Sequence, residues 1–329
     1  MATYKEIYGS TIEVVTSDPE NPVTGQIWYN STDNVVKGAA ATTAGAWATE
    51  ASMNTQKRYL AGAGTKTAAM GFGGITISRT TDTELFDGTS WTEVNNMNTA
   101  RAQLGGTGTQ TSALGFAGST PPYSALNESW NGTSWTEVAD LNTARQQIGN
   151  AGADNTSALA FGGYTGSFQG LTESWNGTSW TEVNDLNDAR NSLGGTGTQT
   201  AALAIGGNTP GVTGNTETWN GTSWTEVNDL NTARLGMGTA GTYTSALSIG
   251  GEPKTAATEV WNGTTWTEDT DLNEARQTLA GAGVSNTSAL AIGGDNPANP
   301  AKADGGGSVG STESWTGAGS PVTYTFTDS

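Results

Sequence analysis

The chain has 329 residues, 47 glycines, no cysteine and no histidine, and a formal net charge of -18. This composition excludes disulfides, zinc sites made of cysteine and histidine, and catalytic triads that use histidine. Its few lysines and arginines never cluster, so we expect neither nucleic acid nor an anionic membrane as a partner.

The first forty residues lie outside any repeat. Residues 11–15 predict one strand, and residues 25–30 and 35–38, joined by Ser-Thr-Asp-Asn, predict a β-hairpin. So small a unit cannot hold a stable core alone, so we expect residues 1–40 to dock elsewhere through Ile27, Trp28 and Tyr29. The segment shows no apolar region of a signal peptide, and no run of the chain is long enough for membrane insertion.

The segment Gly-Gln-Ile-Trp-Tyr-Asn-Ser-Thr-Asp-Asn at residues 25–34 resembles short segments common near the starts of bacteriophage tail-fibre and other virion proteins. The resemblance covers little more than this segment. It implies that residues 1–40 are a virion-anchoring segment.

From residue 41 onward one motif recurs six times. Its cleanest form contains Asn-Thr-Ala-Arg, Leu-Gly-Gly-Thr-Gly, Ser-Ala-Leu-Ala-Phe-Gly-Gly and Thr-Glu-Ser-Trp-Asn-Gly-Thr-Ser-Trp. The last tryptophan of the motif recurs at steps of 44, 44, 45, 44 and 42 residues, at Trp47, Trp91, Trp135, Trp180, Trp224 and Trp266. A fixed period of this length predicts a repeat architecture in which each unit is one supersecondary element.

One repeat, taken over residues 142–183, contains four short segments that predict β-strands. Ser-Ala-Leu-Ala-Phe predicts a buried strand, and Asn176-Gly177 predicts a type I′ hairpin between the last two strands. Four strands without helical periodicity are typical of a β-propeller blade. A linear β-solenoid is the alternative, but its rungs are shorter, roughly 20–30 residues each.

Arginine and glutamate each recur at one position of the repeat. We expect one partly buried, bidentate Arg–Glu pair per blade, which sets strand register more than it adds net stability. The arginines are Arg58, Arg101, Arg145, Arg190, Arg234 and Arg276, and the glutamates are Glu84, Glu128, Glu173, Glu217, Glu259 and Glu313.

The order of arginine, apolar strand, Gly-Gly, Glu-x-aromatic and tryptophan resembles the kelch repeat over roughly residues 45–317. The second unit departs from it with Ala117-Gly118, and the aromatic that is usually tyrosine is mostly tryptophan here. The resemblance implies a divergent six-bladed kelch-like β-propeller over residues 41–317, within an all-β chain.

The two ends of the repeated region each lack a partner. Residues 44–49 read as a last strand without its preceding strands, and the sixth copy ends at Trp315 without its last strand. We therefore expect the N-terminal strand to complete the sixth blade and close the ring. Residues 318–329 are expected to be a C-terminal tail.

The connections between the second and third strands differ in every repeat, whereas the other turns hardly vary. Variable loops on one face often mark the binding face of a repeat protein. Tyr123, Tyr164, Phe168 and Asp295 in these loops are the candidate contacts for a host-surface glycan or protein. The last of these loops, with Pro297, Pro300 and three glycines, is expected to be mobile.

The sequence predicts a binding protein rather than an enzyme. Most acidic residues lie at equivalent repeat positions, and non-repeated acids such as Asp82, Asp154 and Asp295 are the remaining catalytic candidates. No cofactor is expected, and no loop shows the spacing of a known calcium site, although the aspartates and backbone oxygens leave calcium binding open. The leading hypothesis is a bacteriophage structural protein, assembled in the host cytoplasm, present in several copies and bound to other virion proteins through residues 1–40. The alternatives are a bacterial kelch-type interaction protein and a carbohydrate-active enzyme.

Overall fold

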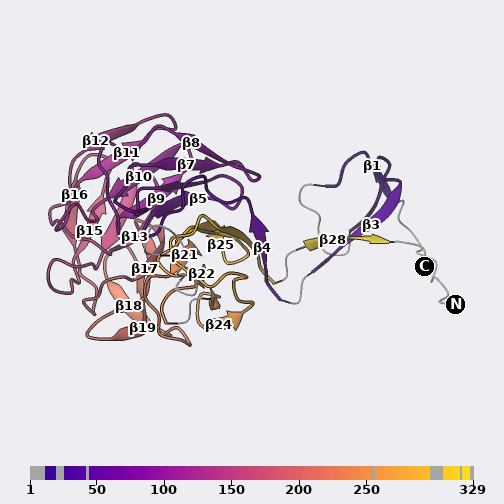
Figure 1. Ribbon diagram of the computed structural model, residues 1–329. Helices are drawn as coiled ribbons and strands as arrows, with labels where there is room; N and C mark the ends of the chain where they lie inside the picture. The colour runs from indigo at the N-terminus through magenta and orange to yellow at the C-terminus, as the bar shows by residue number, and fades with distance from the viewer. Residues whose placement is uncertain are drawn as a thin grey trace. The chain divides into compact units, whose positions relative to one another are not determined.

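The computed structural model describes residues 12–19, 26–41, 44–253, 256–296, 307–318 and 321–326. The chain divides into a small unit, Met1–Gly45 with Gly317–Ser329, and a large unit, Ala46–Thr316. In the described ranges every regular element is a β-strand, and the strands form seven four-stranded sheets (Figure 1). One sheet belongs to the small unit and six belong to the large unit.

The small unit is a sheet in the order β1-β2-β3-β28. Strand β1 (Glu13–Val15) runs parallel to β2 (Ile27–Asn30), and β2 forms the predicted hairpin with β3 (Val35–Ala41). Strand β28 (Pro321–Phe326) pairs antiparallel with the other edge of β3. This pairing differs from the C-terminal tail expected for residues 318–329: the alternating β-forming residues of β28 supply a partner for an edge that would otherwise be unpaired.

The six sheets of the large unit are called the first to the sixth, in the order of their innermost strands. The first has β5 (Ala61–Gly64), β6 (Ala69–Phe72), β7 (Thr83–Phe86) and β8 (Trp91–Val94); the second β9 (Gly105–Thr109), β10 (Ser112–Phe116), β11 (Asn127–Trp130) and β12 (Trp135–Val138). The third has β13 (Gly149–Asp154), β14 (Ser157–Phe161), β15 (Thr172–Trp175) and β16 (Trp180–Val183); the fourth β17 (Gly194–Thr198), β18 (Ala201–Asn208), β19 (Val212–Trp219) and β20 (Trp224–Val227). The fifth has β21 (Gly238–Thr242), β22 (Ser245–Ile249), β23 (Thr258–Trp261) and β24 (Trp266–Asp269); the sixth β25 (Ala280–Ser285), β26 (Ser288–Ile292), β27 (Thr312–Thr316) and β4 (Ala46–Glu50).

In the first five sheets of the large unit, the hairpin between the last two strands is wider than the predicted type I′ turn. Trp130 pairs with Trp135, so the loop has four residues, Asn131–Ser134. The Asn131 side chain accepts hydrogen bonds from the backbone N–H groups of Thr133 and Ser134, and the positive φ, +92°, falls on Gly132. The asparagine therefore acts as an acceptor that organises the turn, and only the glycine takes the left-handed conformation.

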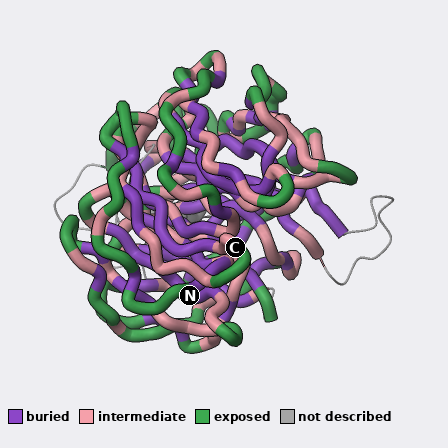
Figure 2. Tube along the Cα trace, turned by 90° about the vertical axis from the view of Figure 1, so that its left-hand side faces the viewer, coloured by how far each residue is buried: buried purple, intermediate pink, exposed green. Residues whose placement is uncertain are grey.

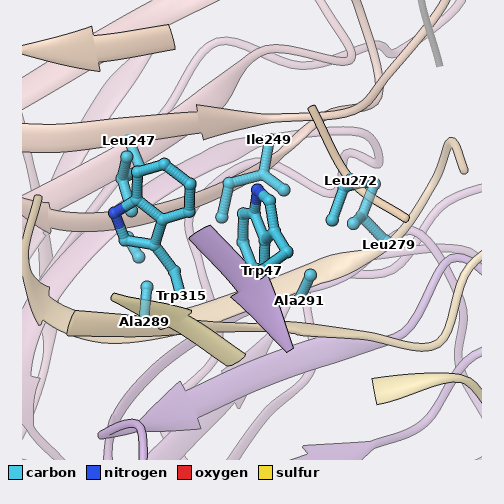
Figure 3. Close-up of a cluster of buried hydrophobic side chains, with 9 residues drawn as sticks. Trp47, Leu247, Ile249, Leu272, Leu279, Ala289, Ala291 and Trp315 are labelled. Atoms are coloured by element: carbon cyan, nitrogen blue, oxygen red, sulfur yellow. The ribbon is translucent and has the colours of Figure 1, made fainter. Parts of the chain in front are cut away.

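The hydrophobic core lies between neighbouring sheets. Each buried cluster joins the second strand of one sheet to the second, third and fourth strands of the next. In Figure 3, Leu247 and Ile249 of the fifth sheet pack against Trp47 and Trp315 of the sixth. Buried residues lie mainly on the inner strands of each sheet, and exposed residues lie on the outermost strands and at the turns (Figure 2).

The first and sixth sheets are also neighbours. Leu290 and Ile292 of the sixth sheet share a buried cluster with Phe86 and Trp91 of the first. Strand β4 pairs antiparallel with β27 along its whole length, with Trp47 opposite Trp315. This repeated arrangement of antiparallel sheets fits a β-propeller.

The last tryptophan of the repeat also ties adjacent sheets together by a hydrogen bond. In five cases its indole N–H donates to a buried threonine hydroxyl of the neighbouring sheet over 3.0–3.2 Å, in the pairs Trp47–Thr258, Trp91–Thr312, Trp135–Thr83, Trp224–Thr172 and Trp266–Thr216. In the sixth case Asn127 occupies the threonine position opposite Trp180, and both the Trp180 N–H and the Asn127 side-chain oxygen are buried without a partner.

Replacing Asn127 with threonine is therefore expected to raise the free energy of unfolding by about 1 kcal/mol, because it gives the Trp180 N–H an acceptor. Denaturant unfolding measures the change. The matched variant Thr172→Asn places asparagine beside Trp224 and should lower stability by a similar amount. If both substitutions left the unfolding midpoint unchanged, the indole–hydroxyl hydrogen bond would make no net contribution to the free energy of unfolding.

Candidate binding face

A closed ring of backbone hydrogen bonds lies ahead of the innermost strands of the six sheets. Each member donates its N–H to the carbonyl of the member from the preceding sheet over 2.6–2.9 Å, and Tyr59 donates to Thr278. We call this set the hydrogen-bond ring; its members are Tyr59, Gln103, Gln147, Ser192, Gly236 and Thr278. The ring links all six sheets without using a side chain.

Every member of the hydrogen-bond ring has a positive φ, between 52° and 61°. This left-handed conformation costs about 1–2 kcal/mol for a residue with a Cβ, and Gly236 alone among the six escapes that cost. Non-glycine residues persist in such conformations only where the surroundings impose them, and they concentrate at ligand sites. The ring is therefore a candidate site in its own right.

A cavity of about 150 Å³ is lined by the hydrogen-bond ring and by the residues that flank it. Its apolar wall includes Leu60, Leu104 and Leu193, which are each 6–7% exposed. Glu252 is exposed and is the acid among the lining residues. Burial raises the pKa of Tyr59, which also lines the cavity, above its usual value. The cavity thus combines an apolar wall with uncharged polar groups and one carboxylate.

The variable loops begin at the same face as this cavity. The residue preceding a ring member forms a backbone bridge with the first residue of the loop, as in Gln146 with Tyr164 and Leu235 with Glu252. The other bridges of this kind are Arg58–Ile75, Ala102–Ser119, Asn191–Asn208 and Gln277–Asp295. The six loops therefore start around one centre.

Three of the predicted contact residues form an aromatic cluster. Tyr123 meets Tyr164 edge to face at 6.2 Å between ring centroids, and Tyr164 meets Phe168 at 6.0 Å. All three side chains are partly exposed. Tyr123 comes from the loop of the second sheet and the other two come from that of the third, so the cluster joins neighbouring loops.

Asp295, the fourth predicted contact, lies elsewhere on the same face. Its carboxylate is 3.6 Å from the Arg58 guanidinium and accepts a hydrogen bond from the Gln277 side chain at 3.3 Å. Most of the loop that follows, including Pro297 and Pro300, lies outside the described residues. The expectation that this loop is mobile is therefore not addressed by the structure.

The Arg58–Asp295 contact corrects the predicted arginine series. Lys57, not Arg58, occupies the repeat position in the first sheet, with its ammonium 3.4 Å from the Glu84 carboxylate. Counting from Met53-Asn54-Thr55, which matches Met97-Asn98-Thr99 before Arg101, would have placed Lys57 there. The number of residues from the preceding motif, and not the presence of an arginine, therefore identifies the repeat position.

The other five Arg–Glu contacts are present and fully buried, at 2.6–2.9 Å: Arg101–Glu128, Arg145–Glu173, Arg190–Glu217, Arg234–Glu259 and Arg276–Glu313. They are not bidentate as expected. In the fifth sheet one Glu259 oxygen accepts from Arg234, while the other accepts from the backbone and side-chain amides of Asn231. The Nη1 of Arg234 donates to the carbonyls of Gly250 and Ala257, and its Nε is buried without a hydrogen-bond partner.

These pairs are structural centres rather than reactive ones. Desolvation lowers the pKa of each of the five arginines below its usual value, and the paired glutamate opposes that effect. Each pair fixes the segment between two sheets to the third strand of the following sheet. A substrate could reach none of them without unfolding the sheet.

The non-repeated acids are not gathered into a metal site. Asp154 is the half-buried last residue of β13, and its carboxylate accepts hydrogen bonds from the backbone N–H and the hydroxyl of Thr156. The Asp82 backbone carbonyl accepts a hydrogen bond from Lys57 at 3.3 Å. In the part of the chain that the structure describes, no group of three acidic residues is placed to hold a metal ion, and no helix is long and apolar enough to cross a membrane.

The three predicted anchoring residues differ in exposure. Trp28 is fully buried within the small unit and donates its indole N–H to Asp18 at 3.0 Å. Tyr29 donates its hydroxyl to Asn34 at 3.1 Å, and Ile27 is 36% exposed. Trp28 therefore supports the small sheet from inside, and Ile27 is the one that presents apolar surface.

Acid is expected to loosen the small unit through Asp18. Hydrogen bonds from Lys37, Asn30 and Trp28, in that order, hold its pKa at about 2, below the usual 3.8. Because the pKa is lower in the folded state, this contribution is present above the unfolded value and is lost as the pH falls from 3.8 toward 2. The indole N–H signal of Trp28 in NMR spectra should shift over that range. In Asp18→Asn the titration should vanish, and a shift that persists would assign it to another group.

No protein-family model matches the chain, and no curated protein matches it in sequence. The solved structure of YjhT is similar to it, with a TM-score of 0.63 at 14% sequence identity, over 79% of this chain and 95% of the YjhT chain. At this identity the similarity concerns the fold alone. Together with the repeated four-stranded sheets, it supports the β-propeller fold for this chain.

Proposed function

We propose that the chain is a structural protein of a bacteriophage particle that binds the host surface, a protein or a glycan, through its variable-loop face. The observation that carries the binding role is the convergence of six dissimilar loops around one cavity, beside the exposed aromatic cluster of Tyr123, Tyr164 and Phe168. The virion role rests on the resemblance of residues 25–34 to virion segments.

In this proposal the large unit is a six-bladed, kelch-type propeller closed by the N-terminal strand. Three observations support closure: β4 pairs with β27, the sixth sheet packs against the first, and the hydrogen-bond ring runs unbroken from Tyr59 through Thr278. The order of the motifs within each repeat supports the kelch type. A closed propeller leaves only the short outer strand of each sheet with an unpaired edge, which suits a protein exposed outside the cell.

The small unit is proposed as the anchor to other virion proteins. The exposed side chains of Ile12, Val14 and Ile27 support this role, since a four-stranded sheet with so little core gains stability by covering apolar surface. The anchor extends beyond the predicted residues 1–40, because β28 completes its sheet. No enzymatic activity is part of the proposal, and its location is the virion.

Mass spectrometry of purified particles tests the virion role. Peptides of this chain should be detected in the particles, in amounts that correspond to several copies of the protein per particle. Absence from particles would exclude this role and favour the alternative of a bacterial interaction protein.

Two substitutions separate anchoring from attachment. Trp28→Ala should reduce incorporation into particles while the isolated protein still binds host cells, because it disrupts only the small unit. Tyr164→Ala should reduce binding to host cells while incorporation into particles is unchanged, because it removes the centre of the aromatic cluster. Loss of both properties in both variants would contradict the division of roles.

A further inference from the structure

We infer that the cavity at the hydrogen-bond ring binds one neutral sugar ring. The inference rests on the proposed function only in taking the variable-loop face as the binding face. The volume of the cavity, about 150 Å³, is below the roughly 300–1,000 Å³ of sites for drug-sized ligands. This volume limits the occupant to a single small ring.

The polar groups around the cavity match hydroxyl groups in kind. Gln103, Gln147, Ser192 and Thr278 carry amides and hydroxyls, which both donate and accept hydrogen bonds, as sugar hydroxyls do. Charged side chains can only donate or only accept. The leucine wall of the cavity suits the C–H faces of a sugar ring.

One of these groups lacks a partner. The Thr278 hydroxyl is buried and makes no hydrogen bond, although Thr278 lines the cavity and belongs to the ring. A buried hydroxyl without a partner is destabilising, and a ligand hydroxyl that reaches it would supply the missing hydrogen bond.

The six-fold pattern is broken at Gly236, and the break makes room. A Cβ added there would meet only the Thr278 side chain at 3.5 Å and its backbone nitrogen at 3.7 Å, so a side chain would fit. The other five ring members carry side chains in the same backbone conformation. The missing side chain leaves a gap beside the methyl group of Thr278, where we place the ligand.

The charge of the cavity excludes acidic sugars. Glu252 lines it and follows the backbone bridge to Leu235, next to Gly236. The lining residues include no lysine or arginine, and Arg58, adjacent to Tyr59, is already 3.6 Å from the Asp295 carboxylate. A carboxylate on the ligand would face Glu252 without a compensating cation.

The test uses the full chain with methyl glycosides of glucose, galactose and N-acetylglucosamine, and with methyl glucuronide as the acidic probe, observed by saturation-transfer NMR and calorimetry. At least one neutral glycoside should bind, with a Kd of about 1 mM, and the glucuronide should bind at least about tenfold more weakly. Failure of every neutral probe, or preference for the glucuronide, would overturn the inference.

Three variants locate the site. Gly236→Asn fills the gap with a residue that tolerates positive φ, and should lower neutral-glycoside affinity at least about tenfold. Gly211→Asn is the matched control, since a Cβ there meets nothing within 4 Å, and should bind like the natural protein. Glu252→Gln should raise the affinity for the glucuronide at least about tenfold, toward that for the neutral glycosides. Equal binding by Gly236→Asn and Gly211→Asn would place the sugar elsewhere.

A folding defect in Gly236→Asn would show in its circular dichroism and melting profile. Gln103→Ala then takes its place, because it removes an amide on the opposite part of the ring and should weaken binding by the same order. If these variants lose sugar binding but still attach to host cells, the aromatic cluster and not the cavity mediates attachment, and the proposed function is retained.

Discussion

Replacing Trp47 with alanine is expected to lower the free energy of unfolding of the large unit by about 3–5 kcal/mol, the usual cost of removing a buried aromatic side chain. Trp47 is 7% exposed, lies 5.1 Å from Trp315 between ring centroids, and donates to Thr258 of the fifth sheet. Its strand is the only part of the sixth sheet that comes from the start of the large unit. The substitution therefore measures what β4 contributes.

Trp135→Ala is the matched control, because Trp135 holds the same place in the second sheet, where all four strands are consecutive. Denaturant unfolding should give losses of similar size for the two variants. A much smaller loss for Trp47→Ala would mean that β4 is held loosely and that the unit is stable without it.

Glu259→Gln is expected to cost about 3–5 kcal/mol, because it leaves the Arg234 charge buried without a counter-charge. Both side chains are fully buried, and desolvation already lowers the pKa of Arg234. The loss should appear as a lower midpoint in denaturant at neutral pH.

Glu268→Gln is the control in the same sheet. Glu268 faces Glu259 across the β23–β24 register but is exposed, so its substitution should change stability by no more than about 0.5 kcal/mol. Equal effects of the two substitutions would show that net charge, not the buried pair, controls stability.

The strands could be predicted from the sequence because the same residue pattern recurs in every repeat. Six copies of one apolar run and one tryptophan spacing outweigh the ambiguity of any single segment. The errors arose where a residue type was weighed above its position. The sequence pattern predicts Arg58 in the series that Lys57 completes, and it predicts a two-residue turn at Asn176-Gly177 although Trp175 pairs with Trp180.

The candidate site was less predictable than the fold. The variable loops could be located from the sequence, but the hydrogen-bond ring could not, because tyrosine, glutamine, serine and threonine carry no preference for positive φ. Gly236 is the only member that suggests it. Strand β28 could have been foreseen from its alternating Val-Thr-Tyr-Thr-Phe, yet its partner, β3, lies at the other end of the chain.

The chain enters and leaves the large unit at one point, since Ala46 is paired with Thr316. In covalent terms the large unit is an insertion between β3 and β28 of the small sheet. Until the large unit has folded, joining β28 to β3 requires closing a loop of hundreds of residues, with its entropy cost. We therefore expect the small sheet to be completed after the large unit has folded, and a copy with a misfolded insertion would present an incomplete small sheet.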